Sequence, residues 1–352
     1  MEDMARKRKE MAVEALRNCF ERVPFAKIES VEDAGGDIEA APDLRVTLLV
    51  PEGKRQLAVA IRNNGEPRIA RIAVRDLLDW RQEFPGTYGV FVAPYISQRS
   101  AGICADEGVG YVDFAGNCRI SFGQVLIERE GKPNLFVQRR GLRSAYSKKA
   151  ARVLRVLLSR PKEAWKVQDL AEEADVSIGQ VSKVKKLLND REFISEERVG
   201  FRLREPEALL KDWARNYTYK KNRVREFFSL KRPAEIEEDI SRVCDSGGLL
   251  YALTAFSAAA RLAPAVRTER VFAYVEDTTE DIEGLLNLRR VSSGANVSLL
   301  TPYDEGVFYG RKEVDGILVA SPIQVYLDLA GFRGRGEEAA EVFLKEVISI
   351  GW

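Results

Sequence analysis

Residues 177–186 carry small, polar and basic side chains at a spacing that suits contact with a charged polymer. At 3.6 residues per turn, Val181, Val184 and Leu188 share one face of a helix, and polar residues take the opposite face. Small residues let a backbone approach phosphates, a glutamine amide bonds to base edges, and lysines neutralise phosphate or reach guanine. We therefore expect this helix to enter the major groove of DNA and to bind it through Ser177, Gly179, Gln180, Ser182, Lys183 and Lys186.

Residue types that support other chemistry are absent or scattered. The chain of 352 residues has no histidine, which excludes Ser-His-Asp and Cys-His nucleophiles and histidine-bound metals. We expect no metal and no cofactor, because the four cysteines form no C-x-x-C pair and are expected as buried thiols: Cys19, Cys104, Cys118 and Cys244. The net charge of +1 means that any nucleic-acid surface is local.

A basic segment leads into this helix. Residues 131–160 contain no Asp or Glu and supply Lys132, Arg139, Arg140, Arg143, Lys148, Lys149, Arg152, Arg155 and Arg160. We expect the segment to mark a domain boundary and to contact phosphates, with Lys148 and Lys149 in the DNA site. A solvated basic linker is the alternative. Beyond the helix, residues 194–204 predict two short strands about Gly200, with Arg198, Arg202 and Arg204 available to the DNA backbone.

Two further helices are expected to hold the 177–188 helix in place. Residues 148–160 and 165–174 each have an apolar helical face, and Ser177-x-x-Gln180 is a capping-box signature. The order of helix, helix, turn, helix and two strands resembles the winged helix-turn-helix family of bacterial and archaeal regulators over residues 148–204. That resemblance implies binding to double-stranded DNA. The alternative is a winged helix that serves only as a protein-contact module.

The N-terminal segment predicts a separate α/β domain, residues 1–137, with the order α-β-β-α-β-α-β-β. This order, with Pro42-Asp43 before a strand, resembles the PD-(D/E)xK restriction-nuclease superfamily. The matching tripeptide in the next strand is Ala60-Ile61-Arg62. Alanine cannot ligate a metal and arginine is a poor proton-transfer group, so we expect a degenerate nuclease-like domain with no catalytic residues. Glu14 and Asp43 alone would make a weak cation site, and the alternative is an active nuclease that uses other carboxylates, such as Glu52 or Glu66.

After residue 233 the pattern is α/β again. A helix after the turn Ala255-Phe256-Ser257, followed by the strand "VFAYV", resembles the nucleotidyltransferase fold. In that family a pair of aspartates on the strand holds magnesium. Here Glu276 and Asp277 come only after the strand, so this resemblance implies a fold and no catalysis.

The C-terminal segments together resemble a more specific family. "WARNYTYKKNRVREFFSL", "YALTAFSAAARLAP" and "PIQVYLDLAGFRGRGEEAAEVFL" are similar to the antitoxin and regulator family of type IV (AbiE-type) toxin–antitoxin systems, best over residues 145–352. The family consists of transcriptional regulators that repress their own operon and are paired with nucleotidyltransferase-like toxins. The nuclease-like segment in front departs from the short antitoxins of this family.

These observations predict a multi-domain α/β protein: residues 1–137, 145–205 with the winged helix, and 212–352 as an antitoxin-type, nucleotidyltransferase-like domain. We expect a sequence-specific DNA-binding transcriptional regulator that acts as a repressor, and not an enzyme. The alternatives are a metal-dependent nuclease and an antitoxin that neutralises a cognate toxin by protein contact.

The cellular context and the oligomeric state are the last expectations. The charged N-terminus and the short apolar stretch at 249–260 predict a cytoplasmic protein with no membrane partner. Residues 212–230 are read as a connecting helix whose aromatic side chains form a dimer seam: Trp213, Tyr217, Tyr219, Phe227 and Phe228. We therefore expect a homodimer on a two-fold DNA site.

Overall fold

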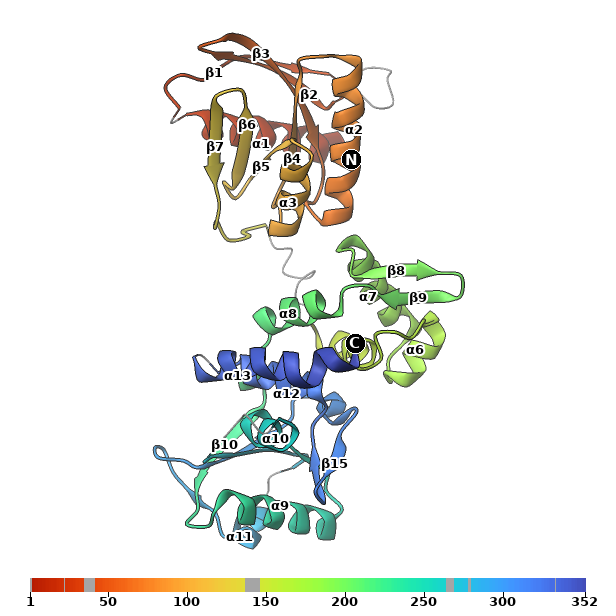
Figure 1. Cartoon of the computed structure of the whole chain (residues 1–352), viewed down its shortest axis with the longest axis vertical. Helices are drawn as coiled ribbons and strands as arrows, with labels where there is room; N and C mark the ends of the chain where they lie inside the picture. The colour runs from red at the N-terminus through yellow and green to blue at the C-terminus, as the bar shows by residue number, and fades with distance from the viewer. Residues whose placement is uncertain are drawn as a thin grey trace. The chain divides into compact units, whose positions relative to one another are not determined.

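The structure is a computed structural model that describes residues 2–21, 23–34, 42–136, 146–263, 269–277, 280–332 and 334–352. The chain divides into two compact units, one built on residues 1–141 and the other on residues 142–352, with Asn189–Glu192 grouped with the first. Each unit combines helices with a seven-stranded sheet, so the predicted α/β class is confirmed (Figure 1). None of the described helices is long and apolar enough to cross a membrane.

The first unit has the sheet order β1-β2-β3-β4-β5-β6-β7. The strands β3, β4 and β5 are parallel, and the remaining neighbours are antiparallel. The elements are α1 (Glu2–Phe20), β1 (Lys27–Asp33), β2 (Leu44–Val50), β3 (Gly53–Ile61), α2 (Pro67–Glu83), β4 (Tyr88–Ala93), α3 (Gln98–Asp106), β5 (Gly110–Asp113), β6 (Cys118–Phe122) and β7 (Val125–Arg129).

Helices cover both faces of this sheet because its central strands are apolar on both sides. Every residue of β4 is buried. One face packs on α1 through Leu16 and Phe20, and the other packs on α2 through Leu77 and on α3 through Ile103. All four cysteines are buried free thiols, as predicted.

The second unit starts with three helices and a hairpin, which we call the helix–hairpin segment (residues 146–205). Its elements are α5 (Lys148–Ser159), α6 (Val167–Glu173), α7 (Ile178–Asp190), β8 (Ile194–Glu197) and β9 (Gly200–Leu203). The hairpin is antiparallel, and the backbone of Trp165 pairs with Phe201 on its other side, through N···O distances of 2.8 and 2.9 Å.

The remainder of the second unit is a mixed sheet between helices, which we call the C-terminal segment (residues 206–352). Its strands lie in the order β13-β10-β14-β12-β11-β16-β15. Its strands and helices are α8 (Pro206–Asn216), β10 (Arg223–Phe228), α9 (Pro233–Gly247), β11 (Tyr251–Leu253), α10 (Ala255–Leu262), β12 (Val271–Val275), α11 (Glu280–Leu285), β13 (Arg289–Arg290), β14 (Val297–Thr301), β15 (Lys312–Val314), β16 (Ile317–Val319), α12 (Pro322–Ala330) and α13 (Arg335–Phe343), with short 3₁₀ turns η1 (Tyr219–Lys221), η2 (Glu305–Phe308) and η4 (Ser349–Gly351) and a closing π-helical turn η3 (Leu344–Ile348).

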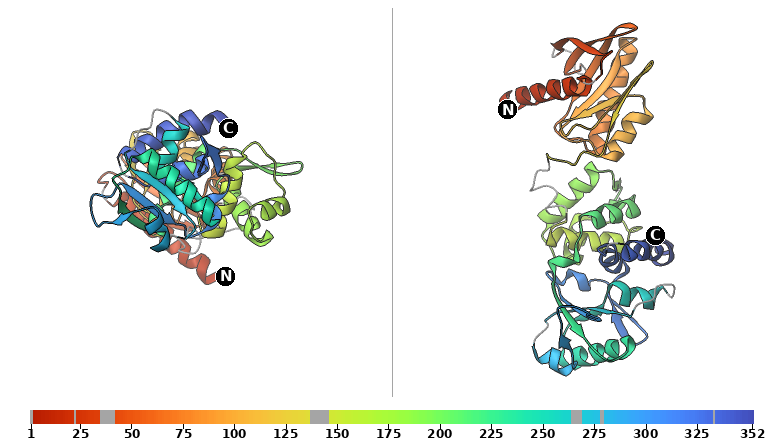
Figure 2. Two further views of the ribbon diagram at one scale, coloured as in Figure 1. Left: turned by 90° about the horizontal axis from the view of Figure 1, so that it is seen from below. Right: turned by 90° about the vertical axis from the view of Figure 1, so that its left-hand side faces the viewer.

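The helices α9 and α11 lie on one side of this sheet and α10, α12 and α13 on the other (Figures 1 and 2). Helix α12 also contacts α5 and α8. One continuous hydrophobic core therefore runs from α5 through α12 and into the sheet. The helix–hairpin segment is packed onto the C-terminal segment through this core.

Two of the element predictions for the second unit are wrong. The predicted connecting helix at 212–230 ends at Asn216, and Arg223–Phe228 form strand β10, because this strand is hydrogen-bonded between β13 and β14. The residues expected as a turn, Ala255-Phe256-Ser257, are instead the first residues of helix α10, and Tyr251–Leu253 before them form strand β11. In both cases pairing with strands distant in sequence overrides local preference.

The aromatic residues proposed for a dimer seam are mostly turned inward. Trp213 and Phe227 are buried in the core, and Tyr219 stacks on Phe332 with ring centroids 4.4 Å apart. The Tyr217 hydroxyl donates to the buried carboxylate of Asp328 at 2.6 Å. Phe228, the fifth, is 37% exposed. Because the other four support the fold, the homodimer stays a prediction without this argument.

Substitution of one buried arginine tests whether the helix–hairpin segment and the C-terminal segment share one core. Arg155 on α5 donates to Gln324 Oε1 on α12 through Nε at 3.1 Å and Nη2 at 2.6 Å, and its guanidinium lies over Trp213. We expect Arg155→Ala to destabilise the second unit by about 2–4 kcal/mol, because it leaves a cavity and an unpaired amide oxygen. Hydrogen exchange should accelerate in both α5 and α12. The exposed variant Arg198→Ala is the control, and faster exchange in α5 alone would contradict a shared core.

Candidate nucleic-acid interface

Helix α7 forms where the sequence predicts it, and its start is capped. The backbone N–H of Gln180 donates to Ser177 Oγ at 3.3 Å. The reciprocal half of the predicted capping box, from the Gln180 side chain, is not seen among the described contacts. Val181, Val184 and Leu188 are buried against the helix–hairpin core, so the orientation of α7 is fixed by its inner face.

The outer face of α7 presents most of the predicted binding residues to solvent. Gln180 is half-buried on the flank, and the exposed residues are Ser177, Gly179, Ser182, Lys183 and Lys186. Among the described residues, neither Lys183 nor Lys186 has an ion-pair partner. Lys185, one position away, is instead paired with Glu196 at 3.0 Å. Two lysines are thus left with uncompensated charge on the exposed face.

The hairpin carries two arginines, one paired with a carboxylate and one without an ion-pair partner among the described residues. Arg198 is exposed in the turn between β8 and β9. Arg202 is also exposed, but its Nη2 pairs with Glu197 at 2.8 Å. Contact between Arg202 and a phosphate would have to compete with that ion pair, so Arg198 is better placed than Arg202 for a direct contact.

The hairpin depends on a glycine at its turn. Gly200 has φ +98°, a conformation that other residues rarely adopt. A Cβ at this position would lie 2.2 Å from the carbonyl oxygen of Trp165. The close approach lets Phe201 pair with Trp165, which ties the hairpin to the segment before α6.

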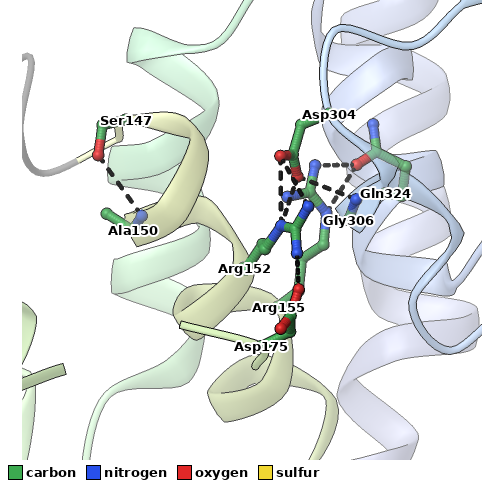
Figure 3. Close-up of polar contacts among 8 residues, drawn as sticks. All are labelled: Ser147, Ala150, Arg152, Arg155, Asp175, Asp304, Gly306 and Gln324. Carbon is green, nitrogen blue, oxygen red and sulfur yellow. Dashed lines mark hydrogen bonds and ion pairs between the residues drawn. The ribbon is translucent and has the colours of Figure 1, made fainter. Parts of the chain in front are cut away.

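The basic run at 131–160 is divided between surface and interior. Lys148 and Lys149 are exposed in the first turn of α5, which is capped by Ser147 (Figure 3). The ammonium of Lys148 lies 5.6 Å from the ring centroid of Tyr303. Arg139, Arg140 and Arg143 lie outside the described residues.

The remaining arginines of the run correct our expectation that they contact phosphate. Arg155 is 1% exposed and bonded to Gln324. Arg152 forms ion pairs with Asp304 of the C-terminal segment and with Asp175 of the turn before α7 (Figure 3). Arg160 Nη2 bonds to the Tyr309 hydroxyl at 2.7 Å. These three arginines are therefore paired with acceptors from other elements of the second unit.

One feature of the outer face was missed from the sequence. Ile178, the first residue of α7, is 55% exposed, and so is Val199 in the hairpin turn. In the major groove an apolar side chain can contact the methyl group of thymine. The position of Ile178 at the start of the helix, one residue after the cap at Ser177, is visible in the sequence.

In the first unit, Asp43, the aspartate of the nuclease-like Pro-Asp pair, is bound by an arginine. Asp43 Oδ2 accepts from the backbone N–H of Ile61 at 2.7 Å and from Arg62 Nη1 at 3.1 Å. Arg62 Nη2 also donates to Asp76 on α2 at 2.9 Å, and Ala60 is buried. The Asp43 carboxylate is therefore neutralised by a guanidinium.

Carboxylates do not gather into a metal site elsewhere in the described residues. No three Asp, Glu or Cys side chains there are placed to hold one ion. In the C-terminal segment Glu276 Oε2 accepts from the backbone N–H of Leu250, and Asp277 pairs with Arg223. The acids that follow β12 thus have structural partners.

Comparisons with known proteins give one family and three distant structures. No curated protein matches the chain. The apo structure of EndoMS matches at 18% identity and a TM-score of 0.22, over 29% of this chain and 45% of that one. A repair endonuclease from Pyrococcus abyssi matches at 14% identity and a TM-score of 0.22, over 30% of this chain and 46% of that one. This chain thus spans less than half of either protein.

The family match starts in the last strand of the helix–hairpin segment and covers most of the C-terminal segment. A resemblance to this family was expected over residues 145–352, and the match confirms it for the part of that range that it covers. Residues 202–349 match the family described as transcriptional regulator, AbiEi antitoxin of the type IV toxin–antitoxin system.

Proposed function

We propose that this protein regulates transcription by sequence-specific binding to double-stranded DNA, and that the helix–hairpin segment is a winged helix with α7 as the recognition helix. The observation that carries the proposal is the outer face of α7, where Lys183 and Lys186 are exposed without ion pairs among the described residues. The match of residues 202–349 to a family of transcriptional regulators supports the same role.

The charge around α7 suits a duplex. Lysines on the helix, Arg198 on the hairpin turn and Lys149 at the start of α5 supply cations, while Gly179 and Ser182 leave room for the backbone to approach. Because the inner face of α7 is buried in the shared core, the helix enters a groove without first becoming ordered, which lowers the entropic cost of binding.

The family match also names the class of partner. We propose that repression of its own operon and pairing with a cognate toxin are the roles in which this DNA binding is used. Neutralisation of the toxin by protein contact is the second candidate, favoured by the word antitoxin in the family description. A protein that binds toxin but no DNA would favour the second candidate over the first.

The two exposed lysines predict a salt-dependent interaction. We expect Lys183→Ala with Lys186→Ala to weaken binding to duplex DNA and to reduce the slope of log K against log salt by about 0.9 for each lysine, since each releases condensed counterions. Fluorescence anisotropy over a salt series measures both quantities. The control with the same loss of charge is Lys220→Ala with Lys221→Ala, both exposed in η1. Equal losses in the two double variants would rule out α7 as the binding helix.

Gln180 predicts a different kind of loss. If its amide bonds to a base edge, Gln180→Ala should cost about 1–3 kcal/mol on the preferred sequence and leave non-specific binding unchanged. Selection of bound DNA fragments followed by competition assays measures this difference. The matched control is Gln168→Ala, an exposed glutamine on α6. An unchanged sequence preference in Gln180→Ala would show that this residue does not read a base.

We also propose that the protein is not a nuclease. The Arg62 guanidinium is bound to both Asp43 and Asp76 and supplies the positive charge that a metal cation would supply there. Addition of Mg²⁺ or Mn²⁺ should therefore leave plasmid and linear DNA intact on agarose gels. Metal-dependent cleavage by the wild type that disappears in Asp43→Ala would reverse this proposal.

A further inference from the structure

We propose that Arg152 and Asp304 are positioning residues for the recognition helix, because a single guanidinium joins the C-terminal segment to the turn from which α7 starts. The inference rests on the proposed function and deepens it. It makes the antitoxin-type part of the chain a determinant of how DNA is read.

Arg152 makes a bidentate, largely buried contact with Asp304 and a single contact with the exposed Asp175. Arg152 Nε lies 3.0 and 3.2 Å from the two carboxylate oxygens of Asp304, and Nη2 lies 3.1 Å from Oδ2. The remaining nitrogen, Nη1, reaches Asp175 Oδ2 at 2.5 Å. Side-chain exposure is 10% for Asp304, 22% for Arg152 and 90% for Asp175. The hydrogen bonds of Arg152 to Asp304 hold the pKa of the guanidinium above its usual value, and desolvation opposes this effect.

Asp304 is itself held rigidly. Its Oδ1 accepts from the backbone N–H of Gly306 at 2.9 Å and so caps the 3₁₀ turn η2. A Cβ on Gly306 would lie 2.6 Å from Asp304 Oδ1 and 2.9 Å from Arg152 Cγ, so the three residues fit only with glycine there. The Arg152 side chain is thus ordered by the C-terminal segment before it reaches the turn (Figure 3).

The conformation of the turn at Asp175 sets the angle at which α7 starts. Asp175 adopts φ +49°, an uncommon conformation for a residue other than glycine. Two residues later, Ser177 caps α7. An exposed ion pair alone contributes little, but a guanidinium already fixed by a bidentate partner loses little entropy when it binds a third group. Asp304 therefore acts through Arg152 on the angle at which α7 leaves the turn.

The decisive variant is Asp304→Asn, because charge and position predict opposite signs. Removal of a carboxylate near a DNA-binding surface raises or preserves affinity if only electrostatics matters. Loss of positioning instead lowers affinity for the selected sequence, and non-specific affinity stays the same or rises. We expect the ratio of specific to non-specific affinity to fall by about fivefold or more. Arg152→Lys, which keeps the charge and loses the fork geometry, should lower the same ratio.

The matched control is Arg160→Gln. Arg160 follows the last residue of α5 and, like Arg152, joins the helix–hairpin segment to the C-terminal segment, here through the Tyr309 hydroxyl. Its ion-pair partner, Glu173, belongs to its own segment, and it has no contact with Asp175 among those described. It should lower thermal stability to a degree similar to Asp304→Asn and leave the specificity ratio unchanged. Circular dichroism melts provide the stability readout for all three variants.

Two results would overturn the inference, and a third would overturn the proposed function as well. An unchanged or higher specificity ratio in Asp304→Asn refutes it, and so does an equal fall in Arg160→Gln. If the wild type has no preference among selected DNA sequences, the proposed function fails and the positioning role falls with it.

Discussion

The contact that organises the second unit is the packing of helix α5 on helix α12. The inner face of α5 belongs to the helix–hairpin core, and its next face carries Arg152 and Arg155 into the C-terminal segment. Arg155 is almost wholly buried, and burial of a cation is costly unless acceptors and an aromatic face stabilise it. Here Gln324 accepts from Nε and Nη2 and the guanidinium lies over Trp213, while Nη1 has no hydrogen-bond partner among the described residues. Because of this contact, the candidate DNA-binding helix is packed onto the C-terminal segment rather than joined to it by a free linker.

Local patterns in the sequence were sufficient for elements whose contacts are close in sequence. The face of α7, its cap at Ser177 and the glycine of the hairpin turn were all readable, since each depends on residues within a few positions or on backbone geometry at one residue. The family of the C-terminal part was also recognisable, and the match over residues 202–349 confirms it.

The failures come from partners that are distant in sequence. The basic run was expected on a surface, but the partners of Arg152 and Arg155 are Asp304 and Gln324, which no local pattern connects to them. Strand β10 was taken for a helix because its pairing with β14 is equally remote. Strand β1 was missed because it is an edge strand with a largely polar pattern, KIESVED, of which no residue is fully buried. The broken nuclease motif was predicted, but the bond of Arg62 to Asp76 was not.

The central claim, that α7 and the hairpin turn contact duplex DNA, is tested most directly by amide hydrogen exchange of the full chain with and without a selected duplex. The account predicts slower exchange at residues 177–186 and 197–200 on binding, with little change on the far helices α9 and α11. Stable binding to the duplex with unchanged exchange at residues 177–186, and protection elsewhere, would contradict it.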